Sequence, residues 1–402
     1  MSGRKMGKYT ILDNEHIDSE VQRILNAVVR EICKAVDVIA IILTGSFGRG
    51  EGTFISQNNG FALSSDFEIC VVAPGLKNRE ACKKLTKKLS KQLCAEISVA
   101  WVTPERIAKN KNGNATFGRS HPSILTYELK SGSKILYGQD VLSQNTTDPT
   151  KIPLWEGLRL LFNRMAESLV EQPSLDSQLY TEKWINKTLL ACGDFLLLDK
   201  KLYHYSYQER GRRLSTQVDF ADYPFLDAAQ QADLINAYDV KLRGAYDTYS
   251  NNDVTRFYKT IDSIFRYAIS NIMNVSFCSY TEFPDRYLSA KAILRKMYKY
   301  KFYFLVHPAY ENLIYMAKLV QWGRAPSMKV VARMRVAWHH LAYSLIPPLY
   351  FFELLSCEER ENILSHANRM LSLFNETPGR SIETVKNGIL RLWFNLCWGK
   401  NV

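Results

Sequence analysis

The sequence predicts an α+β protein in which an N-terminal domain with a mixed β-sheet precedes a larger, mostly α-helical domain. Helix-like and strand-like patterns alternate over the N-terminal third of the chain. From residue 153 onward the strand-like pattern largely disappears, and a polar, turn-rich segment at residues 139–153 separates the two regions. We therefore expect domains at residues 1–145 and 153–402.

The first elements follow from the spacing of apolar residues. Over residues 21–32 the apolar side chains recur every three or four positions, which predicts a helix with one buried face. Residues 38–43 form a continuous apolar run, and residues 66–73 are rich in β-forming side chains. These two segments predict buried strands.

A lysine-rich helix and a third strand follow. Over residues 79–93 leucines recur every four positions, and the other faces carry Lys83, Lys84, Lys87, Lys88 and Lys91. A solvated helix face explains these lysines better than a binding patch, because solubility requires charge on exposed helix positions. Residues 96–102 predict the strand, and Thr103 followed by Pro104 is typical of a helix start.

The composition indicates an ordinary globular protein of 402 residues, with 46% hydrophobic and 23% charged residues. The net charge of +12 favours polyanionic partners such as nucleotides, nucleic acid or anionic lipid headgroups, although many soluble proteins are mildly basic without such a role. From Leu154 onward the apolar spacing is helical, and no internal repeat is evident.

Several classes of protein are disfavoured. The eight cysteines never lie within four residues of one another and the histidines show no HxxxH spacing, so a zinc or redox motif is not indicated. No apolar stretch approaches the ~18 to 20 residues of a membrane span. Residues 1–16 lack the apolar core of a signal peptide. We expect a cytoplasmic protein without membrane partners.

The candidate site lies in residues 43–73. A buried strand ends at Gly45 and Ser46, and if a helix opens there, its free backbone N–H groups and the positive end of its dipole suit a phosphate. The Ser46 hydroxyl and the Arg49 guanidinium add donors for phosphate oxygens. A Gly-Ser pair by itself is more typical of a simple turn.

Two carboxylates strengthen this interpretation. Asp66 and Glu68 lie one residue apart on a predicted strand, so both side chains project from one face while Phe67 and Ile69 point into the core. Close carboxylates repel each other unless cations neutralise them, so the pair predicts Mg²⁺ and a nucleotide, with two ions able to assist an in-line displacement. Two surface acids on an edge strand are the alternative.

This pattern resembles the nucleotidyltransferases of the polymerase-β-like fold, including the minimal and aminoglycoside-type enzymes. Their motif is a hydrophobic strand, Gly-Ser, often Arg-Gly, and then Ser-Asp-x-Asp/Glu on the next strand, matched here by Gly45, Ser46, Arg49, Gly50, Ser65, Asp66 and Glu68. The resemblance implies nucleotide binding by Gly45, Ser46, Arg49 and Ser65. It also implies Mg²⁺ or Mn²⁺ at the catalytic residues Asp66 and Glu68, with Glu96 as the third carboxylate.

The chain departs from the family pattern in two places. Residues 47–65 make a longer interval than usual, with the polar residues 56–60 as an insertion that either gates the site or is inert surface. Glu68 stands where many members have Asp, which changes reach but not charge. The resemblance implies that aminoglycoside-type members accept this change.

The helical region carries weaker signals. The resemblance implies a lysine that contacts the triphosphate, for which we select Lys187, with Lys183 one turn earlier; a solvated lysine is the alternative. Asp194 is a candidate base or an ion-pair partner. Aromatic and basic residues mix at 203–210 and at 295–301, which suits stacking on bases or sugars, although helical periodicity also explains the second run.

The sequence thus predicts a metal-dependent nucleotidyltransferase that moves a nucleoside monophosphate from a nucleoside triphosphate such as ATP to an acceptor hydroxyl, with release of pyrophosphate. The acceptor is a small molecule, a protein or an RNA end. A template-independent RNA-end or oligonucleotide-synthesising polymerase is one alternative, mildly favoured by the charge of +12. A catalytically silent nucleotide-binding or antitoxin-like protein is another, disfavoured by the intact acidic pair.

Overall fold

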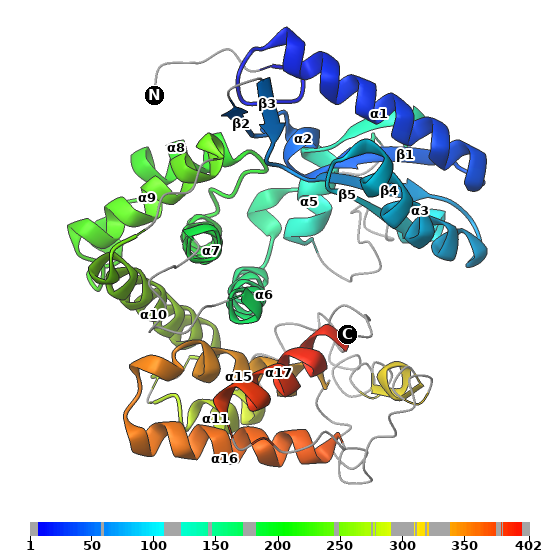
Figure 1. The fold of residues 1–402 in the computed structure, drawn as a ribbon. Helices are drawn as coiled ribbons and strands as arrows, with labels where there is room; N and C mark the ends of the chain where they lie inside the picture. The colour runs from blue at the N-terminus through cyan, green and yellow to red at the C-terminus, as the bar shows by residue number, and fades with distance from the viewer. Residues whose placement is uncertain are drawn as a thin grey trace. The chain divides into compact units, whose positions relative to one another are not determined.

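The fold was analysed in a computed structural model of the chain. The structure describes residues 7–57, 60–107, 122–143, 147–171, 182–244, 249–274, 276–277, 279–290, 309, 312–317, 320, 338–374, 379 and 381–395. The predicted fold class is confirmed: an N-terminal mixed four-stranded sheet with helices is followed by a largely helical region (Figure 1). The run at 295–301 lies outside the described residues.

The sheet has the order β5-β4-β1-β6. Its strands are β1 (Ala40–Thr44), β4 (Phe67–Val72), β5 (Ile97–Val102) and β6 (Lys134–Gly138). Strand β1 is antiparallel to β4 and to β6, whereas β4 and β5 run parallel, which makes the sheet mixed. The three strands predicted from apolar runs are confirmed within two residues at their ends, whereas β6 was not predicted.

Helices cover both faces of this sheet (Figure 1). On one face, α1 (Glu15–Ala35) and α3 (Lys77–Leu93) pack onto the side chains of Leu43, Phe67 and Ile69 in one apolar cluster. On the other face, α4 (Pro104–Ile107) and α5 (Ile124–Ser131) contribute to a second cluster. Alternate residues of β4 therefore point to opposite sides of the sheet.

The interval after Ser46 contains a short helix and a hairpin. Helix α2 (Gly45–Arg49) follows β1 directly. Strands β2 (Phe54–Gln57) and β3 (Gly60–Leu63) pair antiparallel, and their side chains Phe54, Phe61 and Leu63 pack against the first cluster. Part of the expected polar insertion is thus ordered β-structure, because apolar residues flank it on both sides. Asn58 and Asn59 lie outside the described residues.

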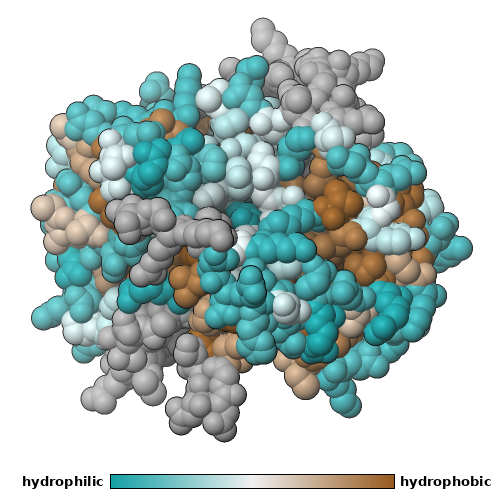
Figure 2. All heavy atoms as spheres, turned by 90° about the horizontal axis from the view of Figure 1, so that it is seen from above, coloured by the Kyte–Doolittle hydropathy of each residue, from teal (hydrophilic) through white to brown (hydrophobic). Residues whose placement is uncertain are grey.

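The helical region contains the remaining described elements: η1 (Pro149–Lys151), α6 (Trp155–Glu171), α7 (Glu182–Asp199), α8 (Tyr207–Thr216), η2 (Phe220–Asp222), α9 (Ala228–Arg243), α10 (Asn251–Met273), α11 (Phe283–Ser289), α15 (His339–Tyr350), η3 (Phe352–Leu354), α16 (Cys357–Leu373) and α17 (Ile382–Trp393). Within the described ranges, none of the helices is both long and apolar enough to cross a bilayer. The face seen in Figure 2 is mostly hydrophilic, with hydrophobic side chains in smaller patches.

The chain divides into two compact units. The first consists of Met1–Pro153, Leu196–Asp222 and Leu234–Tyr246, and the second contains the remaining segments. Helix α8 and the C-terminal part of α9 therefore belong to the same unit as the sheet, although the sequence assigned both to the helical domain. Residues of these two helix segments can therefore contribute to the candidate site.

Candidate functional site

The glycine-serine corner and the acidic pair meet at one end of the sheet. Thr44 ends β1 opposite Glu68, and the Thr44 hydroxyl donates a hydrogen bond of 3.1 Å to the Glu68 carbonyl. Gly45 follows with a φ of 66°, and a Cβ atom there would lie only 2.7 Å from Glu68 Oε1. The structure thus brings the Glu68 carboxyl directly against the corner at Gly45.

The acidic side chains lie on the face of the sheet opposite α1 and α3. Phe67 and Ile69 are buried in the first apolar cluster, so the alternation along β4 directs Glu68 to the other face, as the sequence predicted. Asp66 is half-buried and immediately precedes β4. The two carboxylates therefore share one end of one strand.

The charge on Glu68 is controlled by its surroundings. Its pKa is raised, first because the surrounding protein displaces water and second because Asp66 places a negative charge nearby; Glu128 adds to this rise, while Arg49 and Lys241 oppose it. The Glu68 side chain is nevertheless exposed, which limits the effect of desolvation. A carboxylate pair that repels in this way fits a bound divalent cation, for which carboxylate oxygens are suitable ligands.

The two predicted serines differ in their surroundings. Ser46 is buried in α2, and in the described part of the chain its hydroxyl makes no hydrogen bond. The Ser65 hydroxyl, in contrast, accepts a 3.0 Å hydrogen bond from the Thr53 N–H and lies 2.9 Å from the Thr53 hydroxyl. Ser65 thus fastens the segment before Asp66, whereas Ser46 retains a hydroxyl for a ligand.

Arg49 is held in an internal ion cluster rather than exposed to solvent. Its side chain is only 7% exposed, and its Nε lies 3.1 Å from Glu51 Oε2. Its Nη1 is 3.8 Å from Glu128 Oε2, and its guanidinium lies 4.9 Å from the centre of the Tyr207 ring. Burial lowers the pKa of Arg49, but the electrostatic effects of Glu128, the Tyr207 phenol and Glu51 outweigh burial and raise it.

Residues of the 203–210 segment complete this cluster. Glu51 accepts hydrogen bonds from the Ser206 hydroxyl at 2.7 Å and from the Gln208 N–H at 3.1 Å. Glu128 accepts from the Tyr203 hydroxyl at 2.6 Å and from Arg210 Nη2 at 2.9 Å. We call Arg49, Glu51, Glu128, Tyr203, Ser206, Tyr207, Gln208 and Arg210 the charged cluster. This segment, predicted to suit stacking on bases, is thus packed beside the site.

Lys241 is a cation that the sequence analysis missed. It lies in the last turn of α9, half-buried, with its Nζ 5.9 Å from the centre of the Tyr207 ring. Its positive charge lowers the pKa of Glu68. The residue after α9 lies close to Thr53, because a Cβ on Gly244 would lie 2.5 Å from Thr53 Cβ. A lysine on an amphipathic helix carries no signal in the sequence that identifies this position.

Glu96 is not gathered into a three-carboxylate centre. It is exposed just before β5, where its carbonyl accepts a 2.8 Å hydrogen bond from the Phe67 N–H, so the parallel register places it beside Asp66. Among the residues that the structure describes, no three His, Cys, Asp or Glu side chains are grouped so that they could hold a metal ion. Of the three predicted metal ligands, Asp66 and Glu68 are thus the two whose charges interact in the structure.

The two lysines selected from α7 lie beside a tryptophan ring of their own helix. Lys187 Nζ lies 4.0 Å, and Lys183 Nζ 5.1 Å, from the centre of the Trp184 ring. Asp194, the candidate base, is buried further along the same helix. All three belong to the second compact unit, whereas the acidic pair belongs to the first.

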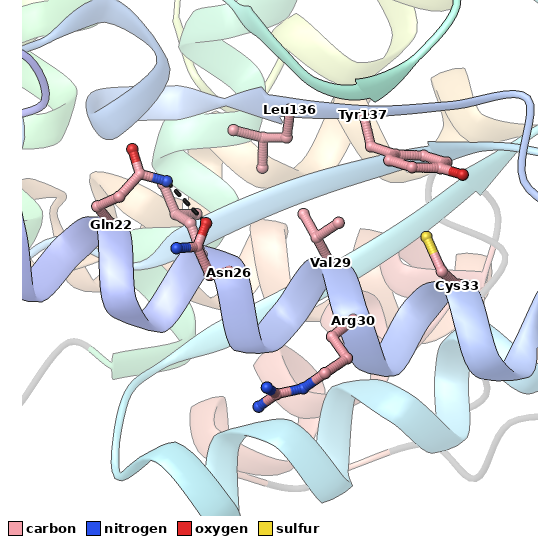
Figure 3. A pocket seen from close by; sticks show the side chains of 8 residues that line it. Gln22, Asn26, Val29, Arg30, Cys33, Leu136 and Tyr137 are labelled. Carbon is pink, nitrogen blue, oxygen red and sulfur yellow. Dashed lines mark hydrogen bonds between the residues drawn. The ribbon is translucent and has the colours of Figure 1, made fainter.

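A surface hollow of about 310 Å³ lies elsewhere in the first unit, between α1 and β6 (Figure 3). Figure 3 shows Val29 and Cys33 of α1 facing Leu136 and Tyr137 of β6, with a hydrogen bond between Gln22 and Asn26 at one end. None of the candidate site residues lines it. This hollow is therefore separate from the site formed by Asp66 and Glu68.

Comparison with known proteins found no match for the chain among protein-family models, curated proteins or solved structures. The geometry of the site and its motif are therefore the basis for a functional proposal.

Proposed function

We propose that the chain is a metal-dependent nucleotidyltransferase that moves a nucleoside monophosphate from a nucleoside triphosphate to an acceptor hydroxyl and releases pyrophosphate. One observation carries this proposal: the Glu68 carboxyl lies against the positive-φ corner at Gly45, with the charge of Asp66 beside it. The motif resemblance supports the same chemistry.

The residues of the first unit take distinct roles in this proposal. Asp66 and Glu68 would hold Mg²⁺ or Mn²⁺, which when bound supplies positive charge for a triphosphate and for an attacking hydroxyl. The Ser46 hydroxyl, from a residue that is largely buried at this corner, would donate to a phosphate oxygen. Lys241 brings a positive charge toward the same carboxylates and suits a triphosphate tail. The work of these groups is positioning and charge stabilisation.

Arg49 has a supporting role. Because Glu51 and Glu128 already engage its guanidinium, Arg49 holds the end of α2 in place and so positions the Gly45 corner. Its charge also opposes the rise in the pKa of Glu68. We therefore assign it to positioning rather than to direct phosphate contact.

A catalytically silent nucleotide-binding protein is the second candidate. It is favoured by the exposed position of Glu96, which joins no three-acid group among the described residues. A protein of this kind would bind a nucleoside triphosphate without releasing pyrophosphate.

The test is incubation of the full chain with each α-labelled nucleoside triphosphate, Mg²⁺ or Mn²⁺ and a cell extract, followed by measurement of pyrophosphate and labelled product. We expect Asp66→Asn and Glu68→Gln each to lower transfer at least about 100-fold, because each removes a negatively charged ligand. Glu80→Gln is the control, since Glu80 is exposed on α3 and pairs with Lys83. Transfer that survives both site variants would reject the assignment, and nucleotide binding without pyrophosphate would select the silent protein.

A further inference from the structure

The outer face of α3 carries a stripe of four lysines that have no acidic partner among the described residues. Lys77, Lys84, Lys87 and Lys91 are all exposed, and within the described part of the chain no carboxylate lies within ion-pair distance of any of them. Their spacing of three, four and seven residues places them along one side of the helix. At 1.5 Å per residue, the stripe from Lys77 to Lys91 is about 21 Å long.

Several basic residues on other helices, unlike those of this stripe, are paired with acids. Arg23 pairs with Glu20 at 2.7 Å, and Arg286 pairs with Glu282 at 2.8 Å, each within one helix turn. On α3 the one acidic residue, Glu80, pairs with Lys83, while Lys88 pairs with Glu31 of α1 at 2.7 Å. The stripe therefore presents net positive charge rather than a neutralised surface, which favours a binding role over the merely solvated face expected from the sequence.

The helix that carries the stripe is firmly attached to the sheet. The Thr86 hydroxyl accepts a 3.0 Å hydrogen bond from the Val99 N–H, and the Ser90 hydroxyl accepts a 3.1 Å bond from the Ile97 N–H. Leu85 and Leu89 are buried in the core on the opposite side of the helix. The lysines therefore stand on a fixed support, so binding need not order the backbone.

We propose that this stripe on α3 binds the phosphate backbone of a nucleic-acid duplex without reading its sequence. Lysine ammonium groups along a 21 Å line complement a polyanion whose charges recur about every 1.7 Å along its axis. A single strand is less suitable, because such proteins stack bases on aromatic rings and residues 77–93 include no aromatic side chain. A membrane surface is also less suitable, because among the described residues of α3 and its N-cap only Leu76 is a large, exposed apolar side chain.

This proposal does not rest on the proposed activity, because duplex binding is measured without nucleotide or metal. The probes are an RNA duplex and a DNA duplex of about 20 base pairs, one strand of the RNA alone, and phosphatidylserine vesicles, each titrated with the full chain at several salt concentrations. We expect both duplexes to bind, with log K falling against log salt at a slope of about −3 to −4 for four phosphate contacts.

The decisive variant is Lys84→Gln/Lys87→Gln/Lys91→Gln. It should reduce the slope by about 2 to 3 and weaken duplex binding at least about tenfold at low salt. The control, Lys151→Gln/Lys201→Gln/Lys259→Gln, removes the same charge from exposed positions elsewhere and should change binding less than about twofold. Unchanged melting temperatures would show that both variants fold. The proposal would be overturned if the α3 substitutions left duplex affinity unchanged. It would also be overturned if the unmodified chain bound the single strand or the vesicles more tightly than the duplexes.

Discussion

Glu68 is the side chain whose protonation matters most for the proposed chemistry. Its pKa is raised by surrounding protein, by Asp66 and by Glu128, and is lowered by Arg49 and Lys241. A cation is held by the ionised carboxylate, so transfer should decline as the pH falls through this raised pKa. In the proposed reaction, the balance of these neighbours would therefore set the lowest pH at which transfer occurs.

Replacing Lys241 with methionine should move that limit to higher pH. The lysine charge lowers the pKa of Glu68, so its removal lets the pKa rise and more alkaline conditions are needed to ionise the carboxyl. Loss of a charged contact to phosphate should also raise KM for the triphosphate about tenfold. The measurement is the pH profile of kcat/KM, with Arg243→Met, an exposed cation just beyond it on α9, as the control. If kcat/KM of Lys241→Met and of the unmodified protein declined at the same acidic pH, Lys241 would not control the ionisation of Glu68.

His340 predicts a second pH dependence, this time of stability. It is buried in α15, its Nδ1 lies 2.7 Å from the Tyr287 hydroxyl, and burial lowers its pKa from 6.5 to about 4. Between these values the unfolded chain binds more protons, so the free energy of unfolding decreases as the pH falls. The expected loss between pH 7 and pH 5 is about 2 kcal/mol.

Urea unfolding at several pH values checks this expectation. His340→Gln should flatten the dependence between pH 6.5 and about 4, because it removes the titrating group. His16→Gln, at an exposed position in α1, should keep the wild-type dependence. An unchanged slope in His340→Gln would show that another group is responsible.

At the scale of elements, the junction between β1 and α2 forms the site. Antiparallel pairing of β1 with β4 brings Thr44 opposite Glu68, and the next residue must turn away at once. Gly45 does so with a φ of 66° and with no room for a side chain. The corner and the carboxylate are therefore placed by the same pair of strands.

Gly45→Ala tests this junction. A Cβ there meets the Glu68 carboxyl at 2.7 Å, so we expect loss of transfer together with a destabilisation above about 1 to 2 kcal/mol, the usual cost of a left-handed non-glycine residue. Gly75→Ala is the matched control, because Gly75 has a φ of 74° and open space around it. Gly75→Ala should lose only the stability that a left-handed alanine costs and should retain transfer. Urea unfolding measures the stability, and formation of labelled product measures the transfer. Equal activity in both variants would show that contact with Glu68 is irrelevant.

Elements differ in how far the sequence revealed them. Strands β1 and β4 were predictable because they are mostly buried and rich in apolar residues, and β5 because its buried and exposed residues alternate. Strand β6 is short and largely half-buried or exposed, so no apolar run marks it; its pairing with β1 is a long-range contact. The hairpin of β2 and β3 was obscured by the polar residues between its strands.

At the scale of the whole molecule, the first unit is closed by segments distant in sequence. The Ser206 hydroxyl and the Gln208 N–H bind Glu51, and Arg210 binds Glu128, within the charged cluster. Glu51 and Arg210 are each only 1% exposed. Because buried charges are costly without partners, the cluster ties residues near 50 firmly to residues near 207.

Glu51→Gln should therefore destabilise the protein by about 3 kcal/mol, since it leaves the buried Arg49 with less compensating charge. Glu209→Gln, which removes a more exposed partner of Arg212 and Arg213, should cost less than about 1 kcal/mol. Chemical denaturation compares the two variants. A similar decrease in the free energy of unfolding in both variants would show that the buried ion pairs of the cluster stabilise the protein no more than exposed ones.

The sequence by itself determined the fold class, the three apolar strands and the acidic pair, because periodicity and alternation are local properties of the chain. It also placed Phe67 and Ile69 on the buried face. Tertiary structure alone decided that Arg49 is enclosed by Glu51 and Glu128, and that Lys241 acts on Glu68. Ion pairs and long-range charge depend on which distant segments meet in space, and no spacing along the chain encodes that meeting.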